Sequence, residues 1–159
     1  MKDAMGGTWL TGLVIIFIAV FAGFLAYSIS YTKAFRTKNE IINIIEKSEG
    51  FTTSNYIDLH NTSDEQLRDD DSAEAKAFLF IKSLGYDYET AEQVRCDDGN
   101  IQTGGYCLKK YCPDDGKIYY KVTTFIALSI PVFNITVKLP IAGETKTMFY
   151  DVTGNNNCD

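Results

Sequence analysis

One histidine, four cysteines and a few groups of acidic residues are the side chains of this sequence that could carry out chemistry. His60, the histidine, stands close to Asp58 and Asn61 in a polar stretch, where a solvated surface position is expected. A serine or cysteine nucleophile would have only this imidazole as a base, and no GxSxG, HExxH or phosphate-binding glycine loop is present. The sequence therefore predicts that the protein is not an enzyme.

The acidic residues Asp69–Asp71 stand directly before Ser72. Because negative charge is favourable at the N-terminus of a helix, their simplest role is to cap a helix that begins near Ser72. The alternative is that they hold a calcium ion together with Asp64 and Glu65. The spacing of an EF-hand is missing here, and it is also missing in "CDDGN" and "PDDGK". We expect no metal and no cofactor.

All four cysteines lie in the C-terminal part of the chain, at Cys96, Cys107, Cys112 and Cys158. An even number clustered in a small domain behind a membrane helix is typical of two disulfides formed in an oxidising compartment. Free buried thiols are an alternative, whereas a zinc site would need paired short spacings that are missing. The sequence does not choose among the possible connectivities; the pairing we expect is Cys96–Cys107 with Cys112–Cys158.

A long uncharged stretch near the N-terminus is a candidate membrane helix, which would hold the cysteine-containing domain at a membrane. No residue between Asp3 and Lys33 ionises near neutral pH. As a helix, residues 8–31 would rise roughly 36 Å, enough to cross a hydrocarbon core of ~30 Å. A signal peptide usually has an apolar run of only ~7–15 residues, although Ala26 and Ser28 could serve a signal peptidase as the alternative. We expect a short N-terminal tail over 1–7 and a retained transmembrane helix over 8–32.

The same helix is predicted to continue as an amphipathic stalk over 33–49. Neither proline nor glycine occurs between Phe24 and Glu49, and Gly50 is a natural stop. One side of the stalk is apolar, with Phe35, Ile41, Ile42 and Ile45. This side packs either on the protein's own domain or on copies of itself.

Small residues inside the apolar half favour association between helices. Ala19 and Gly23, and then Ala22 and Ala26, repeat the small-xxx-small spacing that lets helix backbones approach closely in lipid. These four residues are the candidate helix-packing surface.

The remaining residues, 50–159, are expected to form one α+β domain. The net charge of −6 and the pI of about 4.8 argue against nucleic acid as a partner. The segment "SAEAKAFLFIKSLG" predicts a short helix, with Ser72 or Asp71 as N-cap and Gly85 as stop. Three or four β-rich segments then predict an antiparallel meander with a turn at Ala142 and Gly143; they cover 106–112, 118–130, 134–141 and 144–152.

The charges and the cysteines disagree about which side of the membrane holds this domain. Lys33, Arg36 and Lys38 follow the apolar segment, and the positive-inside rule would keep them in the cytoplasm. The disulfides would require an oxidising space outside it. We give the cysteines more weight, because the basic side chains can be occupied on the helix surface, and expect a single-pass protein of the cell membrane with an extracytoplasmic domain.

The order of these elements resembles type IV pilins and pseudopilins. In residue detail, "YTKAFRTKNEIINIIEKSEGF" and "IPVFNITVKLPIAGETKTMFY" are similar to TadE-type minor pilins of the tight-adherence pili of Gram-positive bacteria. The resemblance implies a leader cut after Gly6 or Gly7 by a membrane peptidase. It also implies contacts with the pilus assembly machinery, and assembly of the N-terminal helix with copies of itself or other pilins, into or at the tip of a thin surface filament.

The sequence departs from the pilin pattern at one position. Standard pilins carry a glutamate five residues into the mature helix, where this chain has Thr11 or Gly12. The departure favours a minor or priming subunit, or an unprocessed pilin-like membrane protein, over a major subunit. A monomeric, membrane-anchored binding domain is the alternative function.

Overall fold

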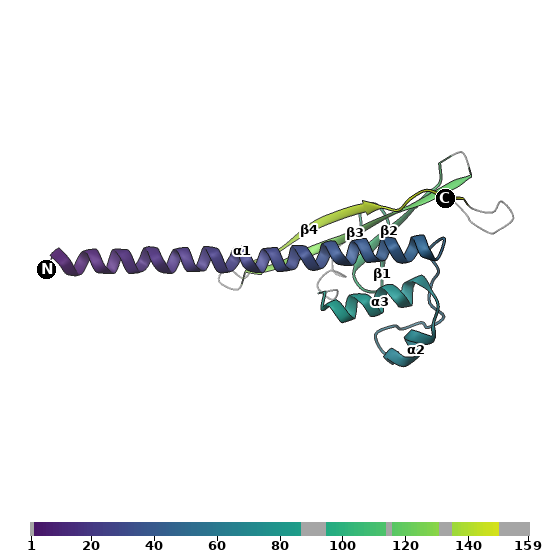
Figure 1. Ribbon diagram of the computed structural model, residues 1–159, viewed down its shortest axis with the longest axis horizontal. Coiled ribbons are helices and arrows are strands. Elements are labelled where there is room, and N and C mark those ends of the chain that lie inside the picture. The colour runs from purple at the N-terminus through teal and green to yellow at the C-terminus, as the bar shows by residue number, and fades with distance from the viewer. Residues whose placement is uncertain (1, 87–94, 114–115, 131–134, 150–159) are drawn as a thin grey trace.

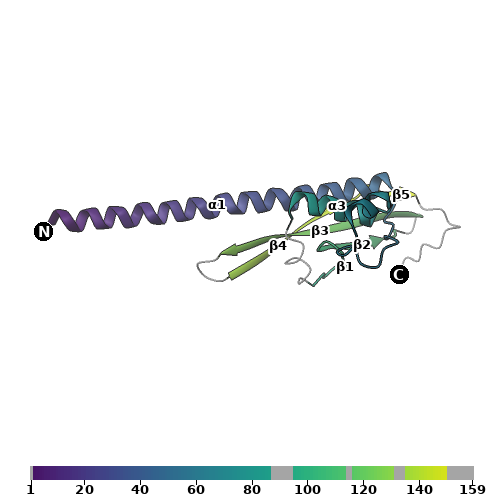
Figure 2. The same cartoon turned by 90° about the horizontal axis from the view of Figure 1, so that it is seen from below.

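A single long helix dominates the computed structural model, and a small α+β domain packs on its C-terminal half (Figures 1 and 2). The structure describes residues 2–86, 95–113, 116–130 and 135–149. The elements are α1 (Lys2–Lys47), α2 (Asp64–Asp69), α3 (Ala73–Leu84), β1 (Asn100–Gln102), β2 (Tyr106–Tyr111), β3 (Lys117–Ile130), β4 (Ile135–Glu144) and β5 (Met148–Phe149). The α+β class and the long N-terminal helix are as predicted.

Helix α1 is uninterrupted from the apolar segment into the stalk, over 46 residues. At its end, the Gly50 amide donates to the Ile45 carbonyl (3.0 Å) and the Glu49 amide to the Glu46 carbonyl (3.4 Å). This is the hydrogen-bond pattern of a Schellman cap. Its left-handed residue is Glu49, with φ +51°, one position before the glycine that the sequence suggested as the stop.

The C-terminal half of α1 buries one face in its own domain. Ala34, Thr37, Ile41 and Ile45 are fully buried, and Lys38 on the same face is nearly so. This settles the alternative for the stalk: its apolar side packs on β3, β4 and α3 of the same chain. Residues of 34–45 on this face are therefore part of the buried core that the domain forms with α1.

Phe35 is the exception among the predicted stalk contacts. It is 39% exposed, because it lies about 100° around the helix from Ala34 and so leaves the buried face. Its ring instead covers the Lys38 ammonium, which lies 4.4 Å from the ring centroid.

The sheet is an antiparallel meander, as predicted, with strand order β1-β2-β3-β4. The longest pairing joins β3 and β4, from Lys121↔Glu144 to Ile130↔Ile135. Strand β1 was missed by the sequence analysis, because it has only three residues in a polar loop. It pairs with β2 through Ile101↔Cys107.

The predicted turn at Ala142 and Gly143 is wrong, because β4 continues through both residues to Glu144. A Cβ atom on Gly143 would lie 2.9 Å from Ile42 Cδ1 and 3.0 Å from Lys38 Cδ. A larger residue would have to displace these two side chains, so glycine suits the close approach of β4 to α1 and does not mark a reversal of the chain.

Of the strand predicted over 144–152, residues 144–149 are described, and within them the pairing is interrupted between the end of β4 at Glu144 and β5 at Met148–Phe149; 150–152 lie outside the described residues. Thr145 interrupts the ladder: its amide donates to the Tyr120 carbonyl, and its hydroxyl accepts from the Tyr120 amide, both at 2.9 Å. After this break, β5 pairs with Lys117 and Ile118 of β3, with the register shifted by one residue relative to β4.

Alternate side chains of β3 form the centre of the core. Ile118, Tyr120, Val122, Thr124 and Ile126 are all buried, as the two-residue period of a strand requires for the face toward α1. The Thr124 hydroxyl donates to the Ala34 carbonyl at 2.9 Å and ties this face directly to α1.

We expect Thr124→Val to lower the free energy of unfolding by about 1 kcal/mol, because it removes a buried hydrogen bond while keeping the side-chain shape. Thr123→Val is the matched control, since Thr123 is on the opposite face of β3 and only partly buried. Urea unfolding of the full chain in micelles, followed by near-UV circular dichroism, gives both values. Equal losses for the two variants would contradict the role of the α1 contact.

Candidate membrane and assembly surface

The N-terminal half of α1 is an apolar rod whose side chains are exposed. Its large apolar side chains, from Trp9 to Tyr31, are 37% to 79% exposed. Among the described residues, this is the one helix long and apolar enough to cross a membrane, and none of its apolar window is buried. A core helix of a soluble protein would be mostly buried, so this surface needs lipid or another chain as its partner.

The four predicted packing residues form a strip on this bare rod. Ala19, Ala22, Gly23 and Ala26 lie at helical spacings of three and four residues and are all exposed. A Cβ atom on Gly23 would meet nothing within 4 Å, so the chain's own fold does not require glycine there. Gly12, which the sequence analysis did not include, lies on the same side, seven residues before Ala19, and is equally unobstructed.

The two candidate cleavage positions, Gly6 and Gly7, lie inside α1. The helix begins at Lys2 and passes both glycines without a break, and the Thr11 hydroxyl donates to the Gly7 carbonyl at 2.9 Å. The backbone therefore marks no boundary between the N-terminal tail over 1–7 and the apolar segment.

Two of the three basic residues after the apolar segment are engaged by the domain. Lys33 Nζ donates to the Gly85 carbonyl at 3.0 Å, at the end of α3. Lys38 is 9% exposed and lies against Phe35. Arg36 is the exposed member of the three. Side chains committed to the fold in this way weaken the charge argument for a cytoplasmic domain.

The predicted Cys96–Cys107 disulfide is confirmed, with the two Cα atoms 5.7 Å apart. It joins the segment before β1 to the start of β2. Cys112 is disulfide-bonded as well. Its expected partner, Cys158, lies outside the described residues.

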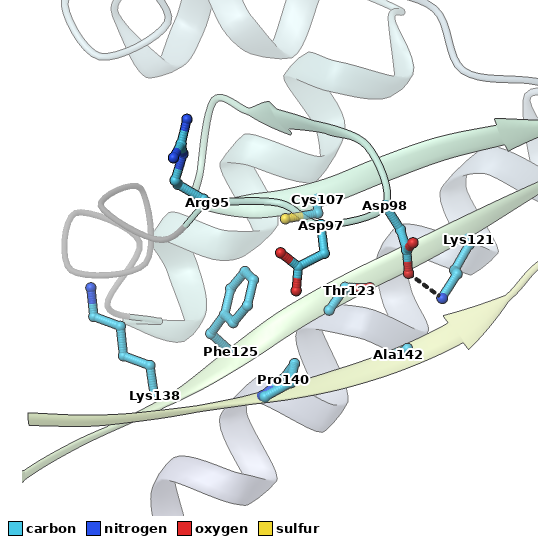
Figure 3. Close-up of a pocket in the computed structure, with 10 residues that line it drawn as sticks. All are labelled: Arg95, Asp97, Asp98, Cys107, Lys121, Thr123, Phe125, Lys138, Pro140 and Ala142. Carbon is cyan, nitrogen blue, oxygen red and sulfur yellow. Dashed lines mark hydrogen bonds and ion pairs between the residues drawn. The ribbon is translucent and has the colours of Figure 1, made fainter.

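A pocket of about 350 Å³ opens on the face of the sheet that is turned away from α1 (Figure 3). The Cys107 half of the disulfide and the Phe125 ring help to line it. Arg95 and Lys138 lie toward one end, and the Asp98–Lys121 ion pair, at 2.6 Å, toward the other.

The Asp98–Lys121 hydrogen bond holds the pKa of the carboxyl below its usual range and that of the ammonium above it. Both groups are at the surface, so this pair adds little stability. The lining combines charges of both signs, which suits this pocket to binding a small polar group.

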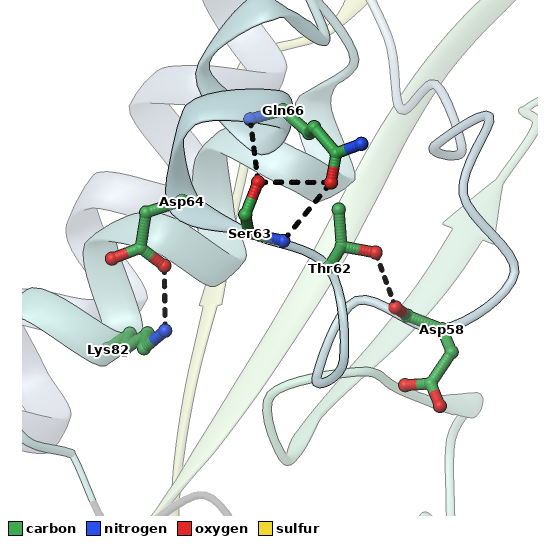
Figure 4. A network of polar contacts seen from close by, with 6 residues as sticks. All are labelled: Asp58, Thr62, Ser63, Asp64, Gln66 and Lys82. Carbon is green, nitrogen blue, oxygen red and sulfur yellow. Dashed lines mark hydrogen bonds and ion pairs between the residues drawn. The ribbon is translucent and has the colours of Figure 1, made fainter.

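The acidic stretch that could have held calcium is instead tied into the loop around α2 (Figure 4). The Asp64 carboxylate accepts from Lys82 Nζ of α3 at 2.6 Å. Ser63 and Gln66 form a reciprocal capping box at the start of α2. In the described part of the chain, no three histidine, cysteine or acidic side chains are grouped as metal ligands.

His60 and Asp58 have structural partners in the same loop. The His60 ring stands edge-on to Phe78, with centroids 5.1 Å apart. Asp58 accepts from the Asn61 side-chain amide at 2.6 Å and from the His60 backbone amide at 3.1 Å. Helix α3 begins and ends as predicted, with Ser72 as its N-cap and Gly85 in the left-handed conformation.

Asp70 is the buried member of the acidic group Asp69–Asp71. Its carboxylate accepts from the Ser54 hydroxyl at 2.5 Å, the Ser72 amide at 3.0 Å and the Asn55 amide at 3.3 Å. These bonds, the Ser54 hydroxyl first, hold the pKa of Asp70 below its usual value. Asp70 thus connects the segment after α1 to the start of α3.

No protein family model, curated protein or solved structure matches this chain.

The Asp70 interactions predict a pH dependence of stability. The pKa of Asp70 is lower in the folded protein than in the unfolded chain, where it is about 3.9. The contribution of Asp70 to the free energy of unfolding is therefore complete at pH values above the unfolded-state pKa, and it is lost as the pH falls through the folded-state pKa. The free-energy difference between the wild-type protein and Asp70→Asn should therefore be constant near neutral pH and shrink below about pH 4.

Urea unfolding at several pH values between about 3 and 7 measures this difference. Asp69→Asn is the matched control, because Asp69 is exposed and has no hydrogen bond among the described residues. A difference for Asp70→Asn that stays constant down to the lowest pH would contradict the assignment.

Proposed function

We propose that this protein is a pilin-like structural subunit, of the TadE type, anchored in the cell membrane by α1. Its domain lies on the extracytoplasmic side, and its N-terminal helix assembles with copies of itself or other pilins into, or at the tip of, a thin surface filament. The observation that carries the proposal is the division of one unbroken helix into a bare apolar half and a half buried in the domain.

The continuity of α1 supports an assembly role beyond simple anchoring. A flexible linker would let the domain move independently of its anchor, whereas no glycine or proline occurs between Phe24 and Glu49. Packing between the apolar halves of two copies would therefore also fix the positions of their domains. Small residues at the contact let such helices approach closely, and van der Waals packing then stabilises the pair.

The extracytoplasmic placement rests on the cysteines. The described cysteines are all disulfide-bonded, and disulfides persist in oxidising compartments. Of the basic residues that argue for the cytoplasm, Lys33 donates to the Gly85 carbonyl, and Lys38 is 9% exposed with its side chain beside Gly143 of β4, so both are used by the fold.

A monomeric, membrane-anchored binding domain is the second candidate, and the pocket beside the disulfide is the observation that favours it. The two candidates differ in what the apolar rod must do. An assembly subunit needs a specific helix face, whereas an anchor needs only hydrophobic length.

Ala22→Leu is expected to lower the association of full-length copies in vesicles about tenfold, equal to about 1.4 kcal/mol, because the larger side chain keeps the helix backbones apart. Ser28→Leu is the matched control, since Ser28 lies about 180° around the helix from Ala19. Crosslinking at a series of protein-to-lipid ratios gives the association for each variant. Equal association for Ala22→Leu, Ser28→Leu and the wild type would leave α1 as a simple anchor.

A further inference from the structure

The β3–β4 hairpin extends well beyond the rest of the domain, in the direction of the N-terminus of α1 (Figures 1 and 2). Contacts along α1 give its direction. The Lys146 amide donates to Glu46 at 2.8 Å near the end of the helix, whereas Thr124 donates to the Ala34 carbonyl twelve residues earlier. Strand β3 therefore runs antiparallel to the C-terminal half of α1, and the hairpin points toward the apolar half of the helix.

The reach of the hairpin follows from strand geometry. β3 continues six residues past Thr124 to Ile130, which is still paired with Ile135. Six residues of strand span about 20 Å, equal to the rise of about 13 helical residues. Counted back from Ala34, this distance reaches about the level of Phe21, inside the apolar segment. The hairpin also diverges from α1 (Figure 2), so the true level is somewhat closer to Ala34.

The composition of this part of the chain suits a membrane contact. In the described parts of the hairpin beyond the buried core, 127–130 and 135–137, no residue is ionisable near neutral pH, and Lys138 is the first charged residue on the returning strand. The side chain of Leu139, on the arm that leads back from the end, is 42% exposed. For these uncharged strand ends, the edge of a bilayer is a more favourable environment than water alone.

The backbone limits how deeply the hairpin can lie. The pairing of β2 with β3 ends at Cys107↔Thr123, and no described strand pairs with the outer edge of β4. Unpaired amides and carbonyls cost several kcal/mol each in hydrocarbon. In the interfacial layer, water and lipid headgroups can satisfy them. The divergence of the hairpin, and a helix tilt that averages about 20° in membranes, are compatible with that shallower depth.

We propose that the paired ends of β3 and β4, residues 127–130 and 135–138, are a second membrane contact, immersed in the interfacial layer of the leaflet next to the domain. This inference rests on the proposed membrane anchoring by α1. The domain then touches the bilayer at two places, the helix and the hairpin, which fixes its orientation on the membrane surface before any assembly.

A fluorophore on a single cysteine tests the contact. Ser129→Cys places it near the end of β3, and Thr147→Cys, exposed at the opposite end of the sheet, is the control. The full chain is labelled without reductant, because the described cysteines are disulfide-bonded, and the unsubstituted chain is the labelling blank. The labelled proteins are reconstituted in phosphatidylcholine vesicles that carry a nitroxide near the carbonyl end of the acyl chains.

The label at 129 should lose about half or more of its fluorescence, because the nitroxide lies next to an interfacial layer only about 5–8 Å thick. The label at 147 should stay at the level measured without nitroxide. An equal loss of fluorescence at 129 and 147 on adding the nitroxide lipid would overturn the proposal. Quenching at 129 that varies with protein density, together with energy transfer between copies, would overturn it in favour of a contact with a second copy.

A third label, at Val20→Cys in α1, separates this inference from the proposed anchoring. Quenching at 20 without quenching at 129 leaves α1 in the bilayer and removes the hairpin contact. No quenching at either position removes the anchoring and the hairpin contact together.

Discussion

The burial of one face of α1 in the domain is the interaction on which the rest of the structure depends. Ala34, Ile41 and Ile45 provide the centre of the contact, and Thr124 adds a hydrogen bond between β3 and the helix backbone. Without this half of α1, the buried face of the sheet would lose most of its cover. The same helix continues without a break into an apolar segment that is not buried by the described residues. The domain and the apolar rod are therefore mechanically one piece.

In the proposed function, the assembly surface lies outside any pocket. Exposure of the apolar rod to water is unfavourable, and in the proposed function a bilayer or the helices of other subunits cover it. The loops around α2 are occupied by local caps and ion pairs, and Asp70 is used to hold α3 against the segment after α1. The described polar residues thus serve mainly to build a rigid head on the helix, as the proposed structural role requires.

The sequence was sufficient to predict the elements whose ends or partners depend on residues close by in the chain. Glycine at 85 and serine at 72 bound α3 correctly, the long α1 follows from its uninterrupted pattern, and the Cys96–Cys107 pair lies close in the chain. Gly143 was misread as a turn because its role depends on Lys38 and Ile42, about a hundred residues away. The strip of small residues could be predicted, whereas the direction and reach of the β3–β4 hairpin could not, since they follow from how β3 docks on α1.

The most direct test of the account is the mass of the intact protein isolated from its native membrane, with thiols alkylated before and after reduction. The account predicts that the apolar segment from residue 8 onward is retained, that residues through Gly6 or Gly7 are removed, and that the cysteines become alkylated only after reduction. A chain that still begins at Met1 and has four free thiols would contradict it, because such a protein was neither processed as a pilin nor exported to an oxidising compartment.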